Sequence, residues 1–383
     1  MSRSKVLSHA RRNVWDGQLL KGETLHRVAV ALSGGVDSST AAVLLVEQGY
    51  EVIGVMMRLW ATHYQGEFPE NPCCSASAVA DARQVCALLD IPFHLADLED
   101  AFRKEVVDYF CDSYALGRTP NPCLACNRNI KFKTLLHMAL DLGAEYLATG
   151  HYARIRLHNG EYELLKGIDE AKDQAYVLYM LGQKELSHLL FPLGSCTKPQ
   201  VRAIARDRGL PTADRVESQD VCFAQDYRHF VAQQRPGTKR PGPILDRQGR
   251  VLGEHRGIAF YTIGQRRGLG ISAAFALYVL EIDAASNSLT VGPKTALLRR
   301  ALLAEQVSFV AGAPPSHPVF ITAKIRYKAK EASATLIPLQ GQAAKVIFVD
   351  PQPAVAPGQA VVFYHGDVVL GGGIIASTIP VEV

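Results

Sequence analysis

The residues best suited to chemistry in this 383-residue chain begin with a loop rich in glycine and hydroxyl groups. It runs Ala31-Leu-Ser-Gly-Gly-Val-Asp-Ser-Ser39, between an apolar stretch and a helical pattern. Gly34 and Gly35 allow backbone N–H groups to converge, the serines add donors, and the dipole of a following helix favours an anion. The loop lacks the Gly-Lys-Ser/Thr ending of a Walker A loop. It therefore predicts a phosphate cradle of another kind; the alternative, a plain tight turn, needs neither three hydroxyls nor Asp37.

Two cysteines form a Cys-x-x-Cys element behind a proline-stiffened loop. Cys123 and Cys126 lie close in sequence to Arg128 and Lys131. Neighbouring cations and a helix N-terminus stabilise a thiolate over a thiol, so the element predicts a reactive sulfur. Half of a zinc site is the alternative, but no second pair at structural zinc spacing completes it.

A further cysteine, Cys222, ends the first half of the chain within Glu217-Ser-Gln-Asp-Val-Cys-Phe-Ala-Gln225. It follows Cys126 by 96 residues, so the two thiols could meet only through the fold. An inert buried cysteine is the alternative for this segment taken alone.

Strands alternating with helices are predicted around these residues, which indicates an α/β domain with a parallel sheet and right-handed crossovers. Strands are expected at 28–32, 51–57, 93–95 and 146–148, and helices at 40–48, 78–89, 102–114 and 132–142. After about residue 225, Gly-Pro turns separate short β-prone segments. Expected strands at 319–327, 344–348 and 360–364 favour a small antiparallel barrel or sandwich.

Three basic residues alternate along the first of these late strands, namely Lys324, Arg326 and Lys328. On one face of a strand they would form a ridge that follows nucleic-acid phosphates. The alternative is a solvated edge strand protected by lysine. Charge also divides unevenly, because residues 1–225 hold 24 Lys and Arg against 27 Asp and Glu, whereas residues 226–383 hold 17 against 10. A basic C-terminal half is suited to a polyanion, although an ordinary basic surface looks the same.

Taken in order, three motifs resemble those of the tRNA-specific 2-thiouridylases, a family of PP-loop ATP pyrophosphatases. They are Ser-Gly-Gly-Val-Asp-Ser-Ser from Ser33, Thr-Pro-Asn-Pro-x-x-x-Cys-Asn from Thr119, and Glu-Ser-x-x-x-Cys-Phe from Glu217. The resemblance continues through 148–152, 198–202 and 264–270 and covers residues 27–380. It implies an adenine nucleotide alpha hydrolase-like catalytic domain at 27–225, a small central β-rich domain at 226–298 and a C-terminal β-barrel tRNA-binding domain at 299–383, after an N-terminal extension at 1–26.

The resemblance implies ATP-dependent 2-thiolation of the wobble uridine of tRNA. The uridine C2 oxygen would be adenylated at the PP-loop with release of pyrophosphate, and a persulfide sulfur would then displace AMP to give 2-thiouridine. A stacked uridine cannot expose C2, so the base is expected to be flipped out. The implied partners are a tRNA with a uridine wobble base and an upstream persulfide donor, either a cysteine desulfurase or a sulfur relay protein. Mg²⁺ is expected with ATP, with Asp37 as a candidate ligand.

The resemblance also assigns roles to single residues. Cys222 would carry the persulfide, and Cys126 would be the catalytic nucleophile that releases the sulfur and can end as its disulfide partner. ATP would be bound by Ala31, Leu32, Ser33, Gly34, Gly35, Val36, Asp37, Ser38, Met57 and Gly150. Met57 as plain strand core and Gly150 as a plain turn remain alternatives. The target base would meet Asn121, Pro122 and Cys123, and tRNA would meet His151, Lys172, Asp173, Gln174, Arg326, Tyr327 and Gln359.

Cys123 departs from the family pattern, in which many members have Asp at this position. The departure raises the hypothesis that Cys123, Cys126 and Cys222 hold an iron–sulfur cluster with one iron open for sulfide. A persulfide relay is the favoured interpretation of the same residues.

Composition limits the class of protein. Hydrophobic residues make up 48% and charged residues 20%, which excludes a disordered chain. All eight cysteines precede residue 223, unlike a secreted disulfide framework. With no apolar run near ~18 residues and no secretory h-region, we expect a cytoplasmic protein without a membrane partner. The oligomeric state is not predicted.

Two other functions compete with sulfur transfer. One is a PP-loop ligase or amidotransferase partner that delivers nitrogen, which would not need Cys126 and Cys222. The other is a non-catalytic RNA-binding protein with a relic loop, which would bind tRNA without ATP and release no pyrophosphate.

Overall fold

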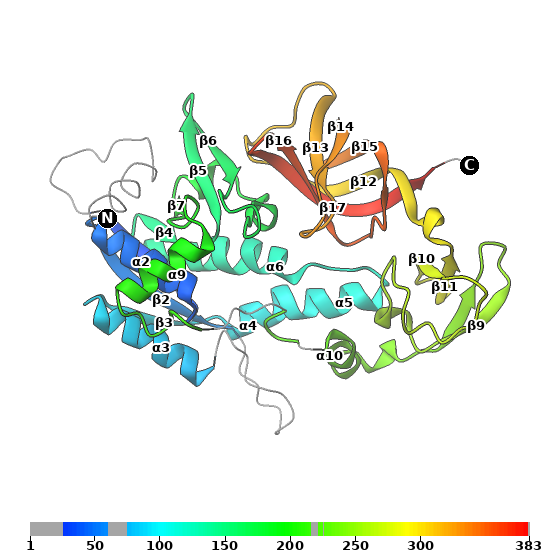
Figure 1. The fold of residues 1–383 in the computed structure, drawn as a ribbon, viewed down its shortest axis with the longest axis horizontal. Helices are drawn as coiled ribbons and strands as arrows, with labels where there is room; N and C mark the ends of the chain where they lie inside the picture. The colour runs from blue at the N-terminus through cyan, green and yellow to red at the C-terminus, as the bar shows by residue number, and fades with distance from the viewer. Residues whose placement is uncertain (1–25, 60–74, 216–220, 225, 382–383) are drawn as a thin grey trace.

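The computed structural model describes residues 26–59, 75–215, 221–224 and 226–381. The predicted N-terminal extension, Cys73 and Cys74, and most of the Glu217–Gln225 motif lie outside these ranges. Figure 1 shows an elongated molecule in which the β8–β11 sheet lies at the far end from the parallel sheet, with the barrel between them on one side.

A parallel sheet forms the first domain, and its strands in the described ranges follow the order β3-β2-β1-β4-β7. Adjacent side chains of a strand point to opposite faces. Val28, Val30 and Leu32 of the central strand accordingly pack with helices α2 and α3, whereas Ala29 and Ala31 pack with the helices of the opposite face. The strands are β1 (Arg27–Leu32), β2 (Glu51–Arg58), β3 (Phe93–Asp97), β4 (Tyr146–Ala148) and β7 (Leu189–Leu190).

Helices cover both faces of this sheet, as a parallel sheet requires. On the first face lie α2 (Val36–Glu47), α3 (Ala76–Leu88) and α9 (Lys198–Asp207). On the other lie two long helical stretches, each with a π-wound section: α4 (Glu99–Phe102), η1 (Arg103–Asp108) and α5 (Tyr109–Ala115), then α6 (Pro122–Ala125), η2 (Cys126–Leu135) and α7 (Leu136–Asp141). Short connecting helices are η3 (Ala175–Leu178) and α8 (Gln183–Leu186).

The helix expected at 132–142 begins ten residues earlier, at Pro122. Asn121 caps it, because its side-chain oxygen accepts a hydrogen bond from the Cys123 N–H at 3.1 Å. Proline at the first helical position also favours initiation there. As a result, Cys123 and Cys126 lie on the helical stretch and not on the loop before it.

The second domain is a small β structure reached through α10 (Tyr227–Gln234). In the part of the chain that is described, its strand order is β10-β11-β8-β9. The strands are β8 (Gly242–Leu245), β9 (Val251–His255), β10 (Tyr278–Asp283) and β11 (Ser288–Gly292), and the short helices are η4 (Pro236–Thr238), η5 (Ile258–Phe260) and η6 (Lys294–Leu297).

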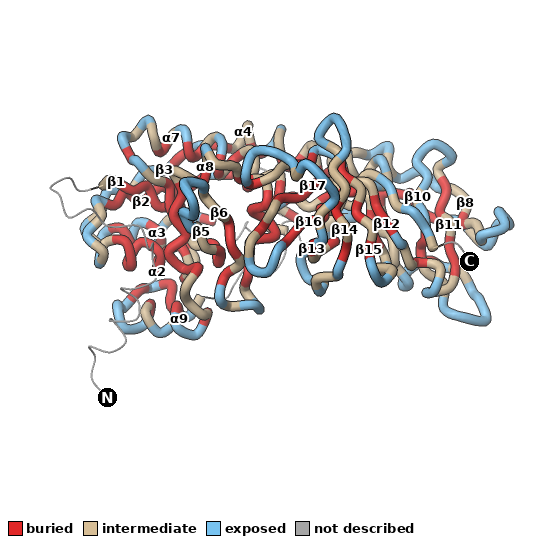
Figure 2. Tube along the Cα trace, turned by 90° about the horizontal axis from the view of Figure 1, so that it is seen from above, coloured by how far each residue is buried: buried red, intermediate tan, exposed pale blue. Residues whose placement is uncertain are grey.

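An antiparallel barrel ends the chain, and pairing of its first strand with its last closes it. Within the described residues its strands are β12 (Leu298–Phe309), β13 (Val319–Lys324), β14 (Ala332–Leu339), β15 (Ala343–Pro353), β16 (Ala360–His365) and β17 (Val368–Pro380). Figure 2 shows buried residues along these strands, with exposed residues at the loops between them. The predicted fold class, a parallel α/β domain followed by a small central domain and an antiparallel barrel, is confirmed.

A hairpin from the first half of the chain extends the barrel sheet, which the sequence patterns did not indicate. Its strands are β5 (Ala153–His158) and β6 (Glu161–Lys166). β6 pairs with β17 through Leu164 and Leu165. The first half of the chain and the barrel therefore share a continuous sheet.

The predicted basic ridge is wrong. Strand β13 ends at Lys324, and residues 325–329 form bends and turns. The Ala329 N–H donates to the Arg326 carbonyl at 3.0 Å, which closes a turn. Arg326 and Lys328 therefore do not alternate along a strand face, and the Lys324 ammonium lies 3.9 Å from the carboxylate of Asp173. Separately, no helix within the described residues has the length and apolar character needed to cross a bilayer.

Candidate active site

The predicted phosphate loop lies where the strand order of the sheet reverses. β1 pairs with β2 on one side and β4 on the other, so the segments after β1 and β4 lie together at the carboxyl edge of the sheet. This crevice is where open α/β sheets bind ligands. Gly150, two residues after β4, contacts the loop directly, because a Cβ there would lie 2.9 Å from the backbone of Asp37 and Ser38. A side chain at Gly150 would clash with the start of α2.

Serine hydroxyls hold the loop in shape. The Ser38 hydroxyl accepts a hydrogen bond from the Ser33 N–H at 3.1 Å and donates to the Gly35 carbonyl at 3.2 Å. The Ser39 hydroxyl also donates to Gly35, at 3.0 Å. Gly35 precedes the twelve-residue helix α2 with no side-chain cap, so the helix's first N–H groups remain directed toward the crevice. An anion placed there would meet these donors and the positive end of the helix dipole.

Gly34 is the loop position that tolerates a side chain least. Its φ of +68° is left-handed, and an added Cβ would lie 2.7 Å from the carbonyl oxygen of Ala78 on α3. We expect Gly34→Ala to destabilise the fold by about 2–4 kcal/mol, because the unfavourable φ costs about 1–2 kcal/mol and the backbone clash adds to it. It should also weaken binding of a phosphate ligand to the loop, since the loop must move away from α3.

Gly49→Ala is the matched control for that substitution, because Gly49 has a φ of +86° with open space around its Cβ position. Urea unfolding of both variants would separate the two contributions. Gly49→Ala should lose only the conformational share, about 1–2 kcal/mol. Equal losses in the two variants would contradict a role for the contact with α3.

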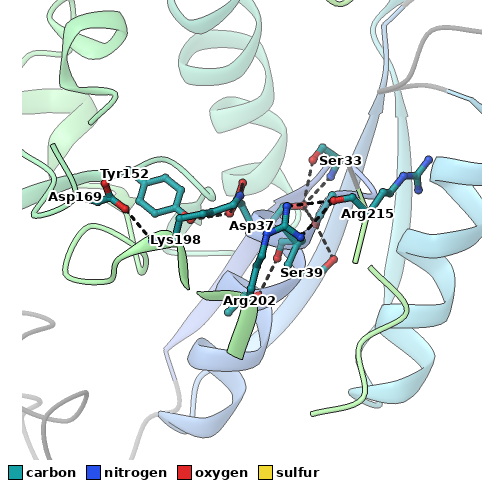
Figure 3. A network of polar contacts seen from close by, with 12 residues as sticks. Ser33, Asp37, Ser39, Tyr152, Asp169, Lys198, Arg202 and Arg215 are labelled. Atoms are coloured by element: carbon teal, nitrogen blue, oxygen red, sulfur yellow. Dashed lines mark hydrogen bonds and ion pairs between the residues drawn. The ribbon is translucent and has the colours of Figure 1, made fainter. Parts of the chain in front are cut away.

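A buried lysine meets the acidic residue of the loop. The Lys198 ammonium donates to both carboxylate oxygens of Asp37 at 2.7 Å, and the Tyr152 hydroxyl donates to one of them at 2.7 Å. The Lys198 side chain is 9% exposed and that of Asp37 is 32% exposed. Figure 3 shows these three side chains converging beside the loop. The loop lacks a Walker A lysine, but Lys198 in the first turn of α9 supplies a cation beside it.

Sequence reasoning did not single out Lys198 as a functional residue. It lies 161 residues after Asp37, and the resemblance over 198–202 assigned no role to it. Its only local signal is the Thr197 capping box that starts α9 there.

Arg215 links the loop to α3. Its guanidinium donates to the Gly34 carbonyl at 3.1 Å and pairs with Asp81 of α3. Arg202 of α9 in turn donates to the Ala213 carbonyl at 2.8 Å, which fixes the segment that carries Arg215 (Figure 3). The contacts tie the loop to α3 and α9, so its glycine backbone is held on both sides.

His151 lies beside this crevice in a neutral setting. It is buried, and its Nδ1 is hydrogen-bonded to the Thr149 hydroxyl at 2.7 Å. Burial, and secondarily the charge of Lys131, hold the pKa of His151 well below its usual range. A neutral imidazole is not suited to pairing with a phosphate as a cation, so any contact with tRNA would use its hydrogen-bonding groups.

The two predicted catalytic cysteines pack against the same hydrophobic core. Cys126, at the start of η2, and Cys222 are each half-buried against the cluster that contains Ala31 and Met57. Phe223 anchors the second cysteine, because its ring packs 5.2–5.6 Å from those of Phe102, Phe110 and Phe230. Both thiols therefore pack on a large hydrophobic core that also includes residues of β1 and of the barrel.

No group of three or more His, Cys, Asp or Glu side chains is placed to hold a metal ion within the described ranges. Cys123 is exposed, whereas Cys126 and Cys222 are half-buried. The three thiols are therefore not gathered into a metal site among the described residues. Asp37 is likewise a poor candidate ligand for Mg²⁺, since its oxygens accept from Lys198 and Tyr152.

The residues predicted to contact tRNA fall into different environments. Arg326 and Tyr327 are exposed, and Lys172 is half-buried. Asp173 is buried, with one carboxylate oxygen accepting from the Gly167 and Ala175 N–H groups. The Gln174 side chain accepts from the Tyr152 N–H at 3.0 Å. In this structure Asp173 and Gln174 therefore support the backbone near the site.

Comparisons with known proteins cover nearly the whole chain. Family models match in succession: a tRNA methyl transferase HUP domain at residues 26–226, a tRNA methyl transferase PRC-barrel domain at 228–293, and an aminomethyltransferase beta-barrel domain at 299–375. A tRNA-specific 2-thiouridylase MnmA from Roseiflexus sp. (strain RS-1) is 50% identical over 370 residues, which is 91% of this chain and 99% of the relative.

Proteins with the same description occur in other bacteria. The one from Moorella thermoacetica is 50% identical over 352 residues, covering 91% of this chain and 99% of its own. The one from Clostridium perfringens (strain 13 / Type A) is 45% identical over 356 residues, covering 92% and 99%. The likeness therefore extends over all the elements that build the crevice.

Proposed function

The chain belongs to the tRNA-specific 2-thiouridylase family, and on that premise we propose that its PP-loop and two cysteines carry out the ATP-dependent 2-thiolation of the wobble uridine of tRNA. The observation that carries the proposal is that one chain combines a phosphate loop at the carboxyl edge of its parallel sheet with two half-buried cysteines, Cys126 and Cys222, that pack on the same hydrophobic core. The matching family models are described by methyl transfer. Two half-buried thiols in a chain that also has a phosphate loop fit sulfur transfer better, as do the names of the full-length relatives.

The first step activates the uridine. Its C2 oxygen attacks the α-phosphorus of ATP, and the bond to pyrophosphate breaks. The Ser33–Ser39 loop and the N-terminus of α2 would hold the phosphates, and the Lys198 ammonium would offset the charge that develops on the departing pyrophosphate. We expect Mg²⁺ to enter with the ATP phosphates.

The second step exchanges oxygen for sulfur. The outer sulfur of a Cys222 persulfide attacks C2, and the C–O bond breaks so that AMP leaves with the uridine oxygen. The Cys126 thiolate then attacks the inner sulfur of Cys222, which forms a Cys126–Cys222 disulfide and releases 2-thiouridine. The sulfane sulfur is reduced by two electrons and the two thiols are oxidised by two. A cellular thiol reductant must therefore reopen the disulfide before the next cycle.

Loading of Cys222 requires a partner. A persulfide donor, either a cysteine desulfurase or a sulfur relay protein, must deliver sulfur to this half-buried thiol. Because the described cysteines do not gather into a metal site, we route no step through an iron–sulfur cluster. The cytoplasmic location expected from the cysteine distribution remains a prediction.

A sulfur-transfer assay tests the proposal. Protein loaded with labelled persulfide sulfur is mixed with an unmodified tRNA transcript that has a uridine wobble base, with and without ATP. We expect labelled 2-thiouridine only with ATP, together with release of pyrophosphate. A transcript with cytidine at the wobble position is the control and should receive no sulfur.

Each contrary result points to a different function. Pyrophosphate release without sulfur transfer would favour another adenylating PP-loop enzyme. Binding of tRNA that is independent of ATP and releases no pyrophosphate would favour the non-catalytic RNA-binding protein.

A further inference from the structure

The C-terminal barrel contacts the segment that leads to the catalytic cysteine. Gln359, next to the start of β16, donates from its side-chain amide to the Thr119 carbonyl at 2.8 Å and toward the Pro120 carbonyl at 3.4 Å. The Thr119 N–H donates to the Pro357 carbonyl at 2.9 Å. Two residues of the barrel thus satisfy backbone groups of a segment 240 residues away in sequence.

On the barrel side of this contact, backbone hydrogen bonds to β17 hold the Gly358–Gln359 segment in place. The Gly358 N–H donates to the Ile375 carbonyl of β17 at 2.9 Å, and the Ile375 N–H donates to the Gln359 carbonyl at 2.8 Å. Gly358 has a φ of +92°, and an added Cβ would lie 2.8 Å from the Thr119 nitrogen. The two backbones therefore approach as closely as a glycine permits.

On the other side of the contact, the Thr119–Pro120 segment lies just before helix α6, which leads to Cys126. Pro120 and Pro122 restrict the backbone on either side of Asn121. Asn121 caps α6 through the Cys123 N–H, and Cys126 follows directly after α6. A displacement of the Thr119–Pro120 carbonyls would therefore be passed to the Cys126 thiol with little loss.

The barrel also contacts the helix just after Cys126. Arg128, two residues after Cys126, donates to the Gln306 side chain of β12 at 3.3 Å. The barrel thus contacts the chain both before Cys126, at Thr119 and Pro120, and after it, at Arg128. Figure 1 shows the α6 stretch running beneath the barrel, between it and α5.

We propose that Gln359 is a positioning residue through which the barrel places the Cys126 thiol for sulfur release. The proposal rests on the function assigned to Cys126 above and deepens it. It differs from the role implied by family resemblance, in which Gln359 contacts tRNA. Its side-chain amide is already directed at two carbonyls of the protein itself.

The experiment compares three variants of the full-length protein. Gln359→Glu replaces the donor by a carboxylate that faces two carbonyl oxygens, and Gln359→Met removes the donor while keeping the length of the side chain. Gln352→Glu is the matched control, because Gln352 lies in β15 of the same barrel and donates to the Asp350 carbonyl. Thermal melts of all three establish that they fold.

Kinetics at saturating tRNA supply the first readout. We expect both Gln359 variants to slow single-turnover sulfur release by about a hundredfold, since a misplacement near 1 Å can cost that much. The Kd for tRNA and the release of pyrophosphate should stay within about threefold of the unchanged protein, and Gln352→Glu should match it. A raised Kd with an unchanged rate at saturation would overturn the proposal in favour of a direct tRNA contact.

Alkylation of Cys126 supplies a readout that does not need activity. The rate of iodoacetamide modification of the Cys126 peptide is followed by mass spectrometry against pH. We expect the midpoint or the limiting rate to change in both Gln359 variants and not in Gln352→Glu. Identical profiles would overturn the positioning role. If the unchanged protein thiolates no tRNA, the proposed function fails, while alkylation still tests the positioning of the thiol.

Discussion

Replacing either catalytic cysteine by serine should lower single-turnover formation of 2-thiouridine below about one-thousandth of the unchanged protein, as loss of an essential nucleophile does elsewhere. A serine hydroxyl cannot carry a sulfane sulfur and is not ionised near neutral pH, so it can neither hold the persulfide nor attack it. Pyrophosphate release should persist in both variants, because Cys126 and Cys222 act after adenylation. The measurement is rapid-quench sulfur transfer alongside a pyrophosphate assay.

The two variants should fail at different steps. Cys222→Ser cannot be loaded and should bind no labelled sulfur at the active site. Cys126→Ser should load and react, and then stop as a covalent Cys222–sulfur–tRNA adduct that an added thiol releases. The adduct is visible as a band of protein bound to tRNA under non-reducing denaturing conditions.

Cys196→Ser is the matched control for both, because Cys196 is also half-buried but packs on a different core cluster. It should keep sulfur transfer within about threefold of the unchanged protein. Full activity in either Cys126→Ser or Cys222→Ser would contradict the relay and favour an enzyme that delivers nitrogen.

The parts of the fold that sequence predicts are those with a local cause. Val28–Leu32 is an unbroken apolar run before a glycine turn, and it is the buried strand β1. The β5–β6 hairpin was not expected, because most of β5 is exposed or half-buried and its sheet is completed by β17, some two hundred residues later. The predicted strand over 319–327 stops at Lys324, since a turn closed by Arg326 and Ala329 replaces it.

The candidate site divides in the same way. The phosphate loop is readable from sequence because its glycines, hydroxyls and helix start are contiguous. Lys198 and Gln359 are not readable, because their partners Asp37 and Thr119 are brought to them only by the tertiary fold. Residue type suggested Asp37 as a metal ligand, and the family resemblance suggested Gln359 as a tRNA contact. The structure shows that both side chains are engaged with other parts of the protein.

Lys198 should be the residue whose loss most impairs the adenylation step. We expect Lys198→Met to slow tRNA-dependent pyrophosphate release by about a hundredfold or more, because a preorganised cation near a developing charge is worth about 3 kcal/mol. Lys184→Met is the control, since that lysine is exposed on α8 and should leave the rate unchanged. Pre-steady-state pyrophosphate release at saturating ATP would measure both.

Loss of Lys198 also leaves the Asp37 carboxylate without its cation, so stability must be separated from catalysis. The pair is neither fully exposed nor fully buried, and we expect Lys198→Met to cost about 1–3 kcal/mol of unfolding free energy, between the limits for surface and buried pairs. Adding Asp37→Asn removes the uncompensated charge and should recover most of that stability. If the double variant also recovered the rate of pyrophosphate release, Lys198 would act only by neutralising Asp37. If the double variant is stable but still slow, the Lys198 charge acts on the phosphates and not only on Asp37.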